Sequence, residues 1–416
     1  MSIDTFLLSA DTTDLNYPEI RPTLDLNFAR VKALDPRITF TRASGGSYVG
    51  ADGLIKYAGV NEPRFDHNPV TGESLGFLVE ESRTNLELNS NNFSESNWIK
   101  SGCSINLADN ILAPDGTITA NKIVESVGLV SPSVRYSVVG TNSGTIYTIS
   151  VYAKSAGRNY LSISAFIAPY QTAIFNLSNG TVTASAGNSC SIISVGNGWY
   201  RCIFVISSTG YTGGPAFGVG QGSYTGDGTS GIYIWGAQIE AGAFPTSYIP
   251  TVASSRTRAA ESASITGKNF RDFYRQDEGT LYLKTKSLAS TSAPSRRLLF
   301  LSSSSSNDPY AVELNFAYSD NIIVASRRGL NANVSSMLNN PTKVSFAWNM
   351  TGSALSVDGQ SVNFTSGTST QRTFDVLQFG YVTYPSPDGT AGNIYMERIT
   401  YYPKRLTNQQ LQVLTR

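Results

Sequence analysis

Apolar and polar residues alternate along much of the chain between residues 93 and 250. In residues 146–153, apolar side chains recur at every second position, as in an antiparallel strand with one buried face. Asn197–Gly198 has the composition of a hairpin turn. Roughly eight such strands, ending with residues 231–239, predict a two-sheet jelly roll over residues 93–250.

A second series of strand patterns follows a segment of low apolar content. The segment, residues 251–269, has the polarity of a linker, with a domain boundary near residue 260. Beyond it, residues 279–285 and 343–348 again read as strands. The pattern predicts a second antiparallel β-sandwich over residues 270–416.

The first 92 residues show little sustained alternation. Prolines such as Pro18, Pro36 and Pro63 divide this segment into short extended pieces, and such a segment rarely folds as a compact core alone. Asp52–Gly53 is a typical tight turn between two apolar pieces. We therefore expect residues 1–92 to form an extended arm that packs on partners.

The last residues are the only ones with a helical pattern. Thr407 and Gln410 have the spacing of a capping box, and Leu406 and Leu411 that of a hydrophobic staple. The expected fold class is thus all-β: an N-terminal extended arm, two antiparallel β-sandwiches and a short C-terminal helix.

The composition is consistent with this fold and argues against nucleic acid and membrane as partners. Lys and Arg total 31 against 30 Asp and Glu, a formal net charge of +1, and only 15% of residues are charged. No basic patch for nucleic acid appears. The N-terminus carries Asp4 rather than a basic region, and no apolar run approaches the ~20 residues of a membrane helix. We expect no nucleic-acid partner, no secretory signal and no membrane insertion.

Cysteine and histidine are scarce. Cys103, Cys190 and Cys202 are too scattered for a disulfide framework or a zinc site, so three free thiols are expected. With a turn at Asn197–Gly198, Cys202 should face Ile193. The single histidine, His67, leaves one candidate base for any nucleophilic triad, and no cofactor is expected.

One sequence matches a catalytic motif in its letters. Residues 72–76 read G-x-S-x-G around Ser74, but a nucleophile elbow needs a strand before it, a helix after it and a downstream histidine. Carboxylate pairs for glycoside hydrolysis, such as Glu80 with Glu81, have a simpler interpretation as solvated or paired strand residues. The prediction is therefore a protein without catalytic residues.

A candidate binding site lies near the C-terminus. Tyr381 and Tyr384 occupy a strand-to-loop junction beside a polar loop that contains Asp388 and Asn393. Aromatic rings with neighbouring polar groups suit a pyranose ring, so these four residues form the predicted glycan site. The loop could also ligate calcium, although a turn held by Asx-type hydrogen bonds is the favoured interpretation, because Asp-Gly and Gly-Asn form such turns without metal; the metal question stays open.

Several segments carry a resemblance to known families. Residues 24–28, 34–44, 62–76 and 80–86 closely resemble a segment recurrent in tailed-bacteriophage head-spike fibre and tail-fibre proteins. Residues 199–202 and 233–242 look like the end of a carbohydrate-binding-module jelly roll. Similarity to concanavalin A-like, laminin-G-type sandwiches is carried by residues 348–359 and 398–406.

The resemblance implies a virion protein. Residues 1–92 would anchor the chain to other virion proteins, while residues 93–250 and 270–416 would face outward and bind host-surface glycan, in a homotrimer on the tail or head of a particle assembled in the host cytoplasm. Two alternatives stay open. One is a passive structural or decoration protein whose sandwiches pack on neighbouring subunits, and the other is a polysaccharide depolymerase.

Overall fold

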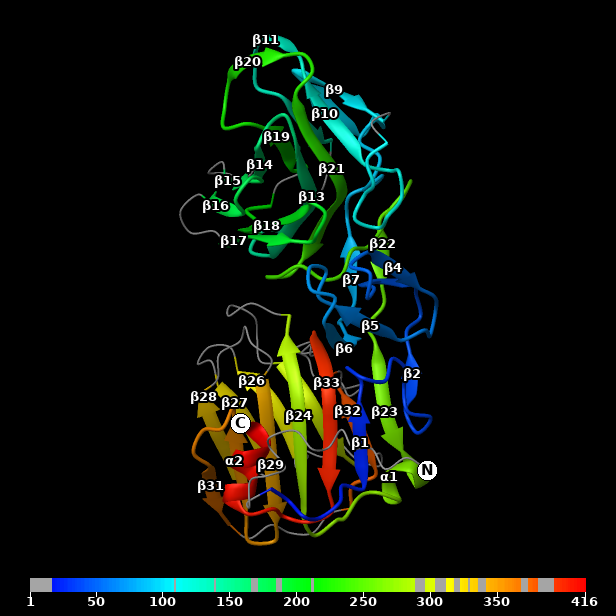
Figure 1. Ribbon diagram of the computed structural model, residues 1–416, viewed down its shortest axis with the longest axis vertical. Helices are drawn as coiled ribbons and strands as arrows, with labels where there is room; N and C mark the ends of the chain where they lie inside the picture. Colours follow the sequence, from blue (N-terminus) through cyan, green and yellow to red (C-terminus); the bar gives the residue numbers. More distant parts are fainter. Residues whose placement is uncertain are drawn as a thin grey trace.

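The computed structural model contains two β-sandwiches arranged along the long axis of the molecule (Figure 1). It describes residues 17–107, 110–137, 140–165, 171–184, 189–210, 213–288, 296–303, 312–317, 322–327, 330–335, 342–367, 373–380 and 393–416. All strand pairs within the sheets of the described residues are antiparallel, and helix is limited there to two short segments. The all-β prediction is confirmed.

The first sandwich consists of two six-stranded sheets. One sheet has the order β17 (Ser189–Ser194), β18 (Tyr200–Ser207), β13 (Ile146–Ala156), β21 (Gly231–Ala241), β10 (Asn121–Glu125), β9 (Cys103–Asn106). The other has the order β16 (Thr181–Ala184), β15 (Gln171–Asn176), β14 (Tyr160–Ala165), β19 (Ala216–Val219), β12 (Ser133–Tyr136), β8 (Trp98–Ser101). Alternate residues such as Ile149 and Val151 on β13 meet Leu161 and Ile163 on β14 in one shared core.

The second sandwich has a larger sheet of eight strands. Its order is β31 (Asn363–Ser366), β30 (Gly352–Val357), β29 (Thr342–Asn349), β24 (Gly279–Ser287), β33 (Ile394–Tyr402), β6 (Ser74–Val79), β5 (Arg64–His67), with β1 (Leu24–Asn27) also paired to β33. The facing sheet has the order β2 (Thr39–Thr41), β23 (Ser262–Thr266), β32 (Val376–Phe379), β25 (Arg296–Ser302), β26 (Val312–Ala317), β27 (Ile322–Arg327), β28 (Leu330–Ser335).

The N-terminal segment differs from the expected arm, because it completes this second sandwich. The strand β33 pairs with β24 along one edge and with both β1 and β6 along the other. Leu24, Phe65 and Phe77 are buried in the same core as Phe346 and Ile399. The segment does not fold as a core of its own, as its prolines indicated. Its partner is the C-terminal part of the same chain (Figure 1).

The expected linker also contains ordered elements. Within residues 251–269, β22 (Arg256–Arg258) pairs with β7 (Arg83–Asn85), and β23 joins the second sandwich. A one-turn helix, α1 (Gly267–Arg271), follows at once, so helix is not confined to the C-terminus. Low apolar content was a poor guide here, because β22 is a three-residue strand in a two-stranded sheet and β23 buries only Ala263 and Ile265 on its core face.

Two further small sheets connect or extend the sandwiches. The hairpin β3 (Gly46–Val49) and β4 (Ile55–Ala58) turns at Asp52–Gly53, as predicted, with Gly53 at φ +76°. The pair β11 (Val127–Val130) and β20 (Tyr224–Asp227) lies at the far end of the first sandwich (Figure 1).

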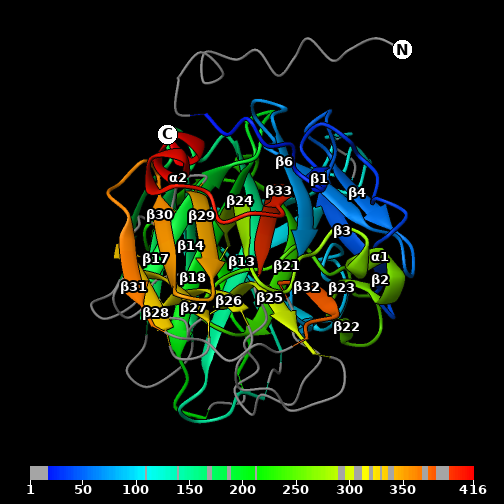
Figure 2. The same ribbon diagram turned by 90° about the horizontal axis from the view of Figure 1, so that it is seen from below.

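The terminal helix α2 (Asn408–Thr415) is built as predicted. The Thr407 hydroxyl accepts from the backbone N–H of Gln410, and the Gln410 side chain accepts from the Thr407 N–H. Leu406 and Leu411 are buried together against Ala347 and Ala354. Because neighbouring residues of β29 and β30 point into the main core, α2 covers the outer face of that sheet (Figure 2).

All three cysteines are free thiols, as predicted. Cys202, however, faces Ile192 rather than Ile193. The hairpin closes with Val195 against Trp199 and has a three-residue loop, Gly196–Gly198, whereas the sequence suggested a two-residue turn. The extra loop residue shifts the register by one.

Candidate functional site

Most of the predicted glycan site lies outside the described residues. Tyr381, Tyr384 and Asp388 belong to that part of the chain, so their placement stays a prediction. Asn393 is described and is fully buried. Its Oδ1 accepts a hydrogen bond from the Glu81 backbone N–H at 3.0 Å, and its carbonyl accepts one from Leu288 N–H. The Asn393 side chain therefore fastens the start of β33 to the N-terminal segment.

The G-x-S-x-G sequence lies in a β-hairpin. Ser74 opens β6 and stands opposite His67 on β5. The Ser74 hydroxyl contacts Lys32 Nζ and accepts from Gly76 N–H, while His67 Nδ1 lies 3.0 Å from the carbonyl oxygen of Val49. These residues therefore form a β-hairpin and not the strand, tight turn and helix of a nucleophile elbow.

Metal ligands and membrane spans can be judged only for part of the chain. Over the residues that the structure describes, no group of three or more His, Cys, Asp and Glu side chains is placed to hold a metal ion. Within the same residues, no helix has the length and apolar character needed to cross a membrane.

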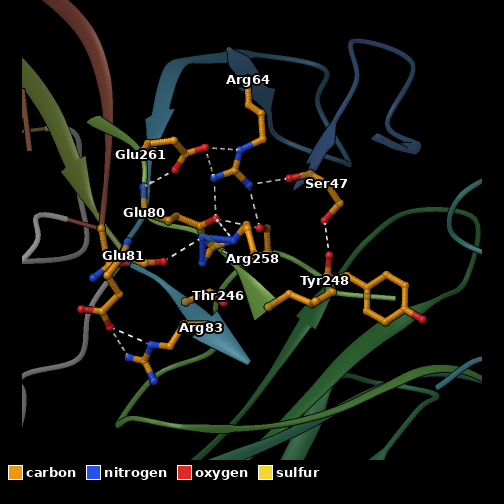
Figure 3. Close-up of polar contacts among 12 residues, drawn as sticks. Ser47, Arg64, Glu80, Glu81, Arg83, Thr246, Tyr248, Arg258 and Glu261 are labelled. Carbon is orange, nitrogen blue, oxygen red and sulfur yellow. Dashed lines mark hydrogen bonds and ion pairs between the residues drawn. The ribbon is translucent and has the colours of Figure 1, made fainter. Parts of the chain in front are cut away.

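The most unusual polar feature is a set of five buried charged residues where the sandwiches meet, here called the junction cluster. It consists of Arg42, Arg64, Arg258, Glu80 and Glu261, each at most 1% exposed. Figure 3 labels four of them, Arg64, Glu80, Arg258 and Glu261. Glu261 lies 2.9 Å from Arg42 and 2.6 Å from Arg64, while Glu80 lies 2.8 Å from Arg64 and 3.3 Å from Arg258. Such a buried pair is costly to break, because removing one partner leaves an unpaired charge.

The junction cluster joins three parts of the chain. Arg64 and Glu80 flank the β5–β6 hairpin, while Arg258 and Glu261 come from the segment after the first sandwich. The last residues of that sandwich also contribute, since the Ser247 hydroxyl donates to Glu80 at 2.6 Å and accepts from Arg64 at 2.7 Å. The cluster thus holds the exit of the first sandwich against the second.

The charges of the cluster set the protonation state of Glu80. Burial alone would raise the pKa of its carboxyl, but Arg258, Arg64 and the hydrogen bonds from Ser247 outweigh burial and lower that pKa to about 2. The neighbouring Asp66 behaves in the opposite way. Burial raises the pKa of Asp66 to about 6, despite hydrogen bonds from backbone N–H groups.

A pocket of about 550 Å³ opens directly over this cluster; we call it the junction pocket. One wall is the β3–β4 hairpin with the residues that follow it. The others are residues 248–250, which follow the first sandwich, and β22. The lining residues are Gly45, Gly46, Tyr57, Ala58, Gly59, Val60, Tyr248, Ile249, Pro250, Arg256, Thr257 and Arg258. Ser47 ties two of these walls together, because its hydroxyl donates to the Tyr248 carbonyl at 2.6 Å.

The rim of the junction pocket combines an exposed ring with an exposed cation. Tyr57 is 50% exposed, and its hydroxyl lies 3.4 Å from the Asp115 carboxylate. Val60 is 60% exposed. Arg256 is exposed and forms no ion pair or side-chain hydrogen bond with any described residue. An aromatic face with polar groups beside it can bind a sugar ring.

A second pocket has a volume of about 510 Å³. It is lined by Asp52, Leu54, Asn110, Ile111, Leu112, Ala113, Pro114, Gly116, Lys154, Val195, Gly196, Asn197 and Trp199. Near this pocket, the Ile55 N–H donates to the carbonyl oxygen of Pro114, one of its lining residues.

Sequence reasoning did not find Tyr57 or Arg256. Tyr57 lies on β4 of the hairpin that the Asp52–Gly53 turn predicted, and Arg256 lies in the segment predicted to be a linker. Nothing in the sequence pairs two positions about 200 residues apart, because their proximity depends on how β7 and β22 pair.

Comparisons with known proteins give limited information. No protein-family model matches the chain, and no curated protein matches its sequence. Among solved structures, the CBM40 of the Ruminococcus gnavus IT-sialidase is similar at 14% identity and a TM-score of 0.29, covering 34% of this chain and 84% of that one. The NanB sialidase from Streptococcus pneumoniae is similar at 14% identity and a TM-score of 0.29, over 36% of this chain and 26% of that one. The VIP36 exoplasmic/lumenal domain is similar at 8% identity and a TM-score of 0.24, over 36% of this chain and 78% of that one. At these TM-scores the similarities assign no ligand to this chain.

Proposed function

We propose that this chain is a bacteriophage adhesion protein that binds host-surface polysaccharide non-covalently, with the junction pocket as a glycan-binding site. The observation that carries this proposal is the pocket itself, which is lined by the exposed Tyr57 and by Arg258 of the buried junction cluster. Binding gains from such preorganisation, because little freedom is lost when the ligand arrives.

The virion part of the proposal is supported by the sequence resemblance of residues 20–100 to head-spike fibre and tail-fibre proteins. In this proposal residues 1–92 present the surface that attaches to other virion proteins on the tail or head, and their described part, residues 17–92, also contributes strands to the second sandwich. Single sugar contacts are weak, so several copies acting together, as in a homotrimer, would supply useful affinity. Cryo-electron microscopy of the intact particle would test the location and copy number.

The proposed mechanism involves no covalent chemistry. The two other functions make different predictions. A passive structural protein would bind no glycan, and a depolymerase would release reducing ends from the polysaccharide. Incubation of the full chain with host polysaccharide, followed by a reducing-sugar assay, separates the depolymerase from the adhesion protein.

Tyr57→Ala tests the site. Stacking of one ring is worth about 1–3 kcal/mol, by analogy with bases on aromatic side chains, so host polysaccharide should bind roughly tenfold more weakly. Phe364→Ala is a matched control, since Phe364 is also 50% exposed but lies on β31. Surface plasmon resonance with immobilised polysaccharide gives both affinities. Equal loss in the two variants would argue against the junction pocket.

The C-terminal tyrosines provide the competing location. If the Tyr381→Ala, Tyr384→Ala double variant abolishes binding while Tyr57→Ala does not, the glycan site lies at the originally predicted position in the second sandwich. The overall proposal of glycan adhesion would stand, and only its site would move.

A further inference from the structure

We infer that the junction pocket selects a sugar residue that bears a carboxylate, with Arg256 as the group that binds this carboxylate. The inference rests on the proposed glycan binding and deepens it, because it names the chemical class of the ligand. Uronic acids and nonulosonic acids share the required feature, a single carboxylate on a pyranose ring.

Arg256 is the first observation. Gly45 and Arg256 both line the pocket. A Cβ placed on Gly45 would lie 3.9 Å from Nη2 of Arg256, so the guanidinium lies next to a residue that has no side chain. The backbone of Arg256 is fixed by the pairing of β22 with Asn85 on β7. A guanidinium presents two parallel N–H donors that match the two oxygens of a carboxylate.

The floor of the pocket is the second observation. Behind Gly46, a Cβ would lie 3.3 Å from the Cδ atoms of both Arg64 and Arg258 and 3.4 Å from Cζ of Arg42. These three buried guanidinium groups are paired with only two carboxylates, those of Glu80 and Glu261. With the Asp66 carboxylate also acting on Arg64, these charges largely offset one another, so the floor is a fixed wall beside which Arg256 supplies the positive charge.

Nearby acidic groups limit the kind of anion. Glu62 accepts from Gly59 N–H, Asp115 accepts from Thr117 and contacts Tyr57, and Asp66 accepts from Val49 and His67 backbone N–H groups. Each is held by uncharged donors rather than by Arg256. Since they would repel a dense polyanion, the arrangement favours one carboxylate directed at Arg256 over a highly sulfated chain.

The experiment compares sugars that differ only in the charged group. Saturation-transfer NMR titrations of the full chain use methyl β-glucuronide, the methyl glycoside of N-acetylneuraminic acid, methyl β-glucoside and methyl β-glucoside 6-sulfate. At least one carboxylated sugar should bind tenfold or more tightly than methyl β-glucoside and the sulfated sugar. Arg256→Gln should remove this preference. Arg271→Gln, the same change of charge on α1, should retain it.

Each outcome has a defined meaning. Unchanged binding of the carboxylated sugars by Arg256→Gln, or equal binding of carboxylated, sulfated and neutral sugars, overturns the inference. A third outcome is that a neutral host polysaccharide binds, that Tyr57→Ala weakens this binding and that Arg256→Gln does not. This outcome also overturns the inference but leaves the proposed function intact. Failure of every glycan, including host polysaccharide, to bind the full chain overturns both.

Discussion

Gly76 shows what a single position contributes where the N-terminal segment meets the C-terminal strand. It lies on β6 with φ +83°, in the left-handed region that favours glycine. A Cβ at this position would lie 2.1 Å from the carbonyl oxygen of Met396 on β33. Only glycine allows the two backbones to approach this closely.

Gly76→Ala should therefore destabilise the protein strongly. The positive φ alone costs about 1–3 kcal/mol, and the collision with Met396 adds to this cost because backbone atoms must move. Gly128→Ala is the control, since Gly128 has φ +95° but no atom within 4 Å of the added Cβ. Chemical denaturation measures both free energies of unfolding. A loss no larger than that of the control would contradict the close approach of β6 and β33.

Glu87 is a buried carboxyl of a different kind. It is fully buried, and neither carboxyl oxygen has a hydrogen-bond partner among the described residues. Burial raises its pKa well above the ordinary value. Because the folded-state pKa exceeds the unfolded one, Glu87 opposes folding once the pH rises above the unfolded value near 4.5.

Glu87→Gln should stabilise the protein at neutral pH. Because Gln has no carboxyl that must stay protonated in the buried site, the gain should be largest at pH 7 and should vanish near pH 4. Thermal and urea unfolding at both pH values give the comparison. A stability difference that does not change with pH would show that Glu87 is not protonated in the folded state.

At the scale of elements, the sequence pattern predicted the strands and the helix whose formation depends on interactions between residues close in sequence. Alternation identified the strands of the first sandwich, and the spacing of Thr407 and Gln410 identified α2. The pairing of β1 with β33 was not predictable, because a four-residue strand has too little pattern and its partner is about 375 residues away. For the same reason the candidate pocket, whose walls come from separate segments, left no sequence signal.

The cap of α2 gives a test at this scale. Thr407→Ala removes the side-chain acceptor for the Gln410 N–H and should lower the free energy of unfolding by about 1 kcal/mol. Thr407→Ser keeps the hydroxyl and should cost much less. Urea denaturation of the two variants decides the matter. Similar losses in both would mean that the Thr407 methyl group, rather than the hydrogen bond, holds the helix.

At the scale of the whole molecule, the junction cluster couples stability to pH. The folded-state pKa of Glu80 lies below its unfolded value, so its contribution is fully present above about pH 4.5 and is lost as the pH falls towards 2. Arg64 remains charged over this range, because Glu261 and Glu80 outweigh its burial and raise its pKa. Acid should therefore loosen the connection between the two sandwiches.

The prediction compares the wild type with Glu80→Gln from pH 7 to pH 2. The wild type should lose on the order of 3 kcal/mol more than the variant over this range, because the variant has no carboxylate to protonate. Asp272→Asn on the exposed end of α1 serves as the control. Parallel stability curves for wild type and Glu80→Gln would contradict the assigned role of the cluster.

The pairing of β33 with β1 and β6 also has a consequence for synthesis on the ribosome. Leu24 pairs with Tyr401, so the first strand must wait for nearly the whole chain to be made. At about 5–20 residues per second, the wait lasts on the order of 20–75 s. During that time β1, β5 and β6 carry unpaired strand edges, which are sites of aggregation. The strands of the two six-stranded sheets of the first sandwich all lie between residues 98 and 241, so this sandwich can fold before β33 has been made.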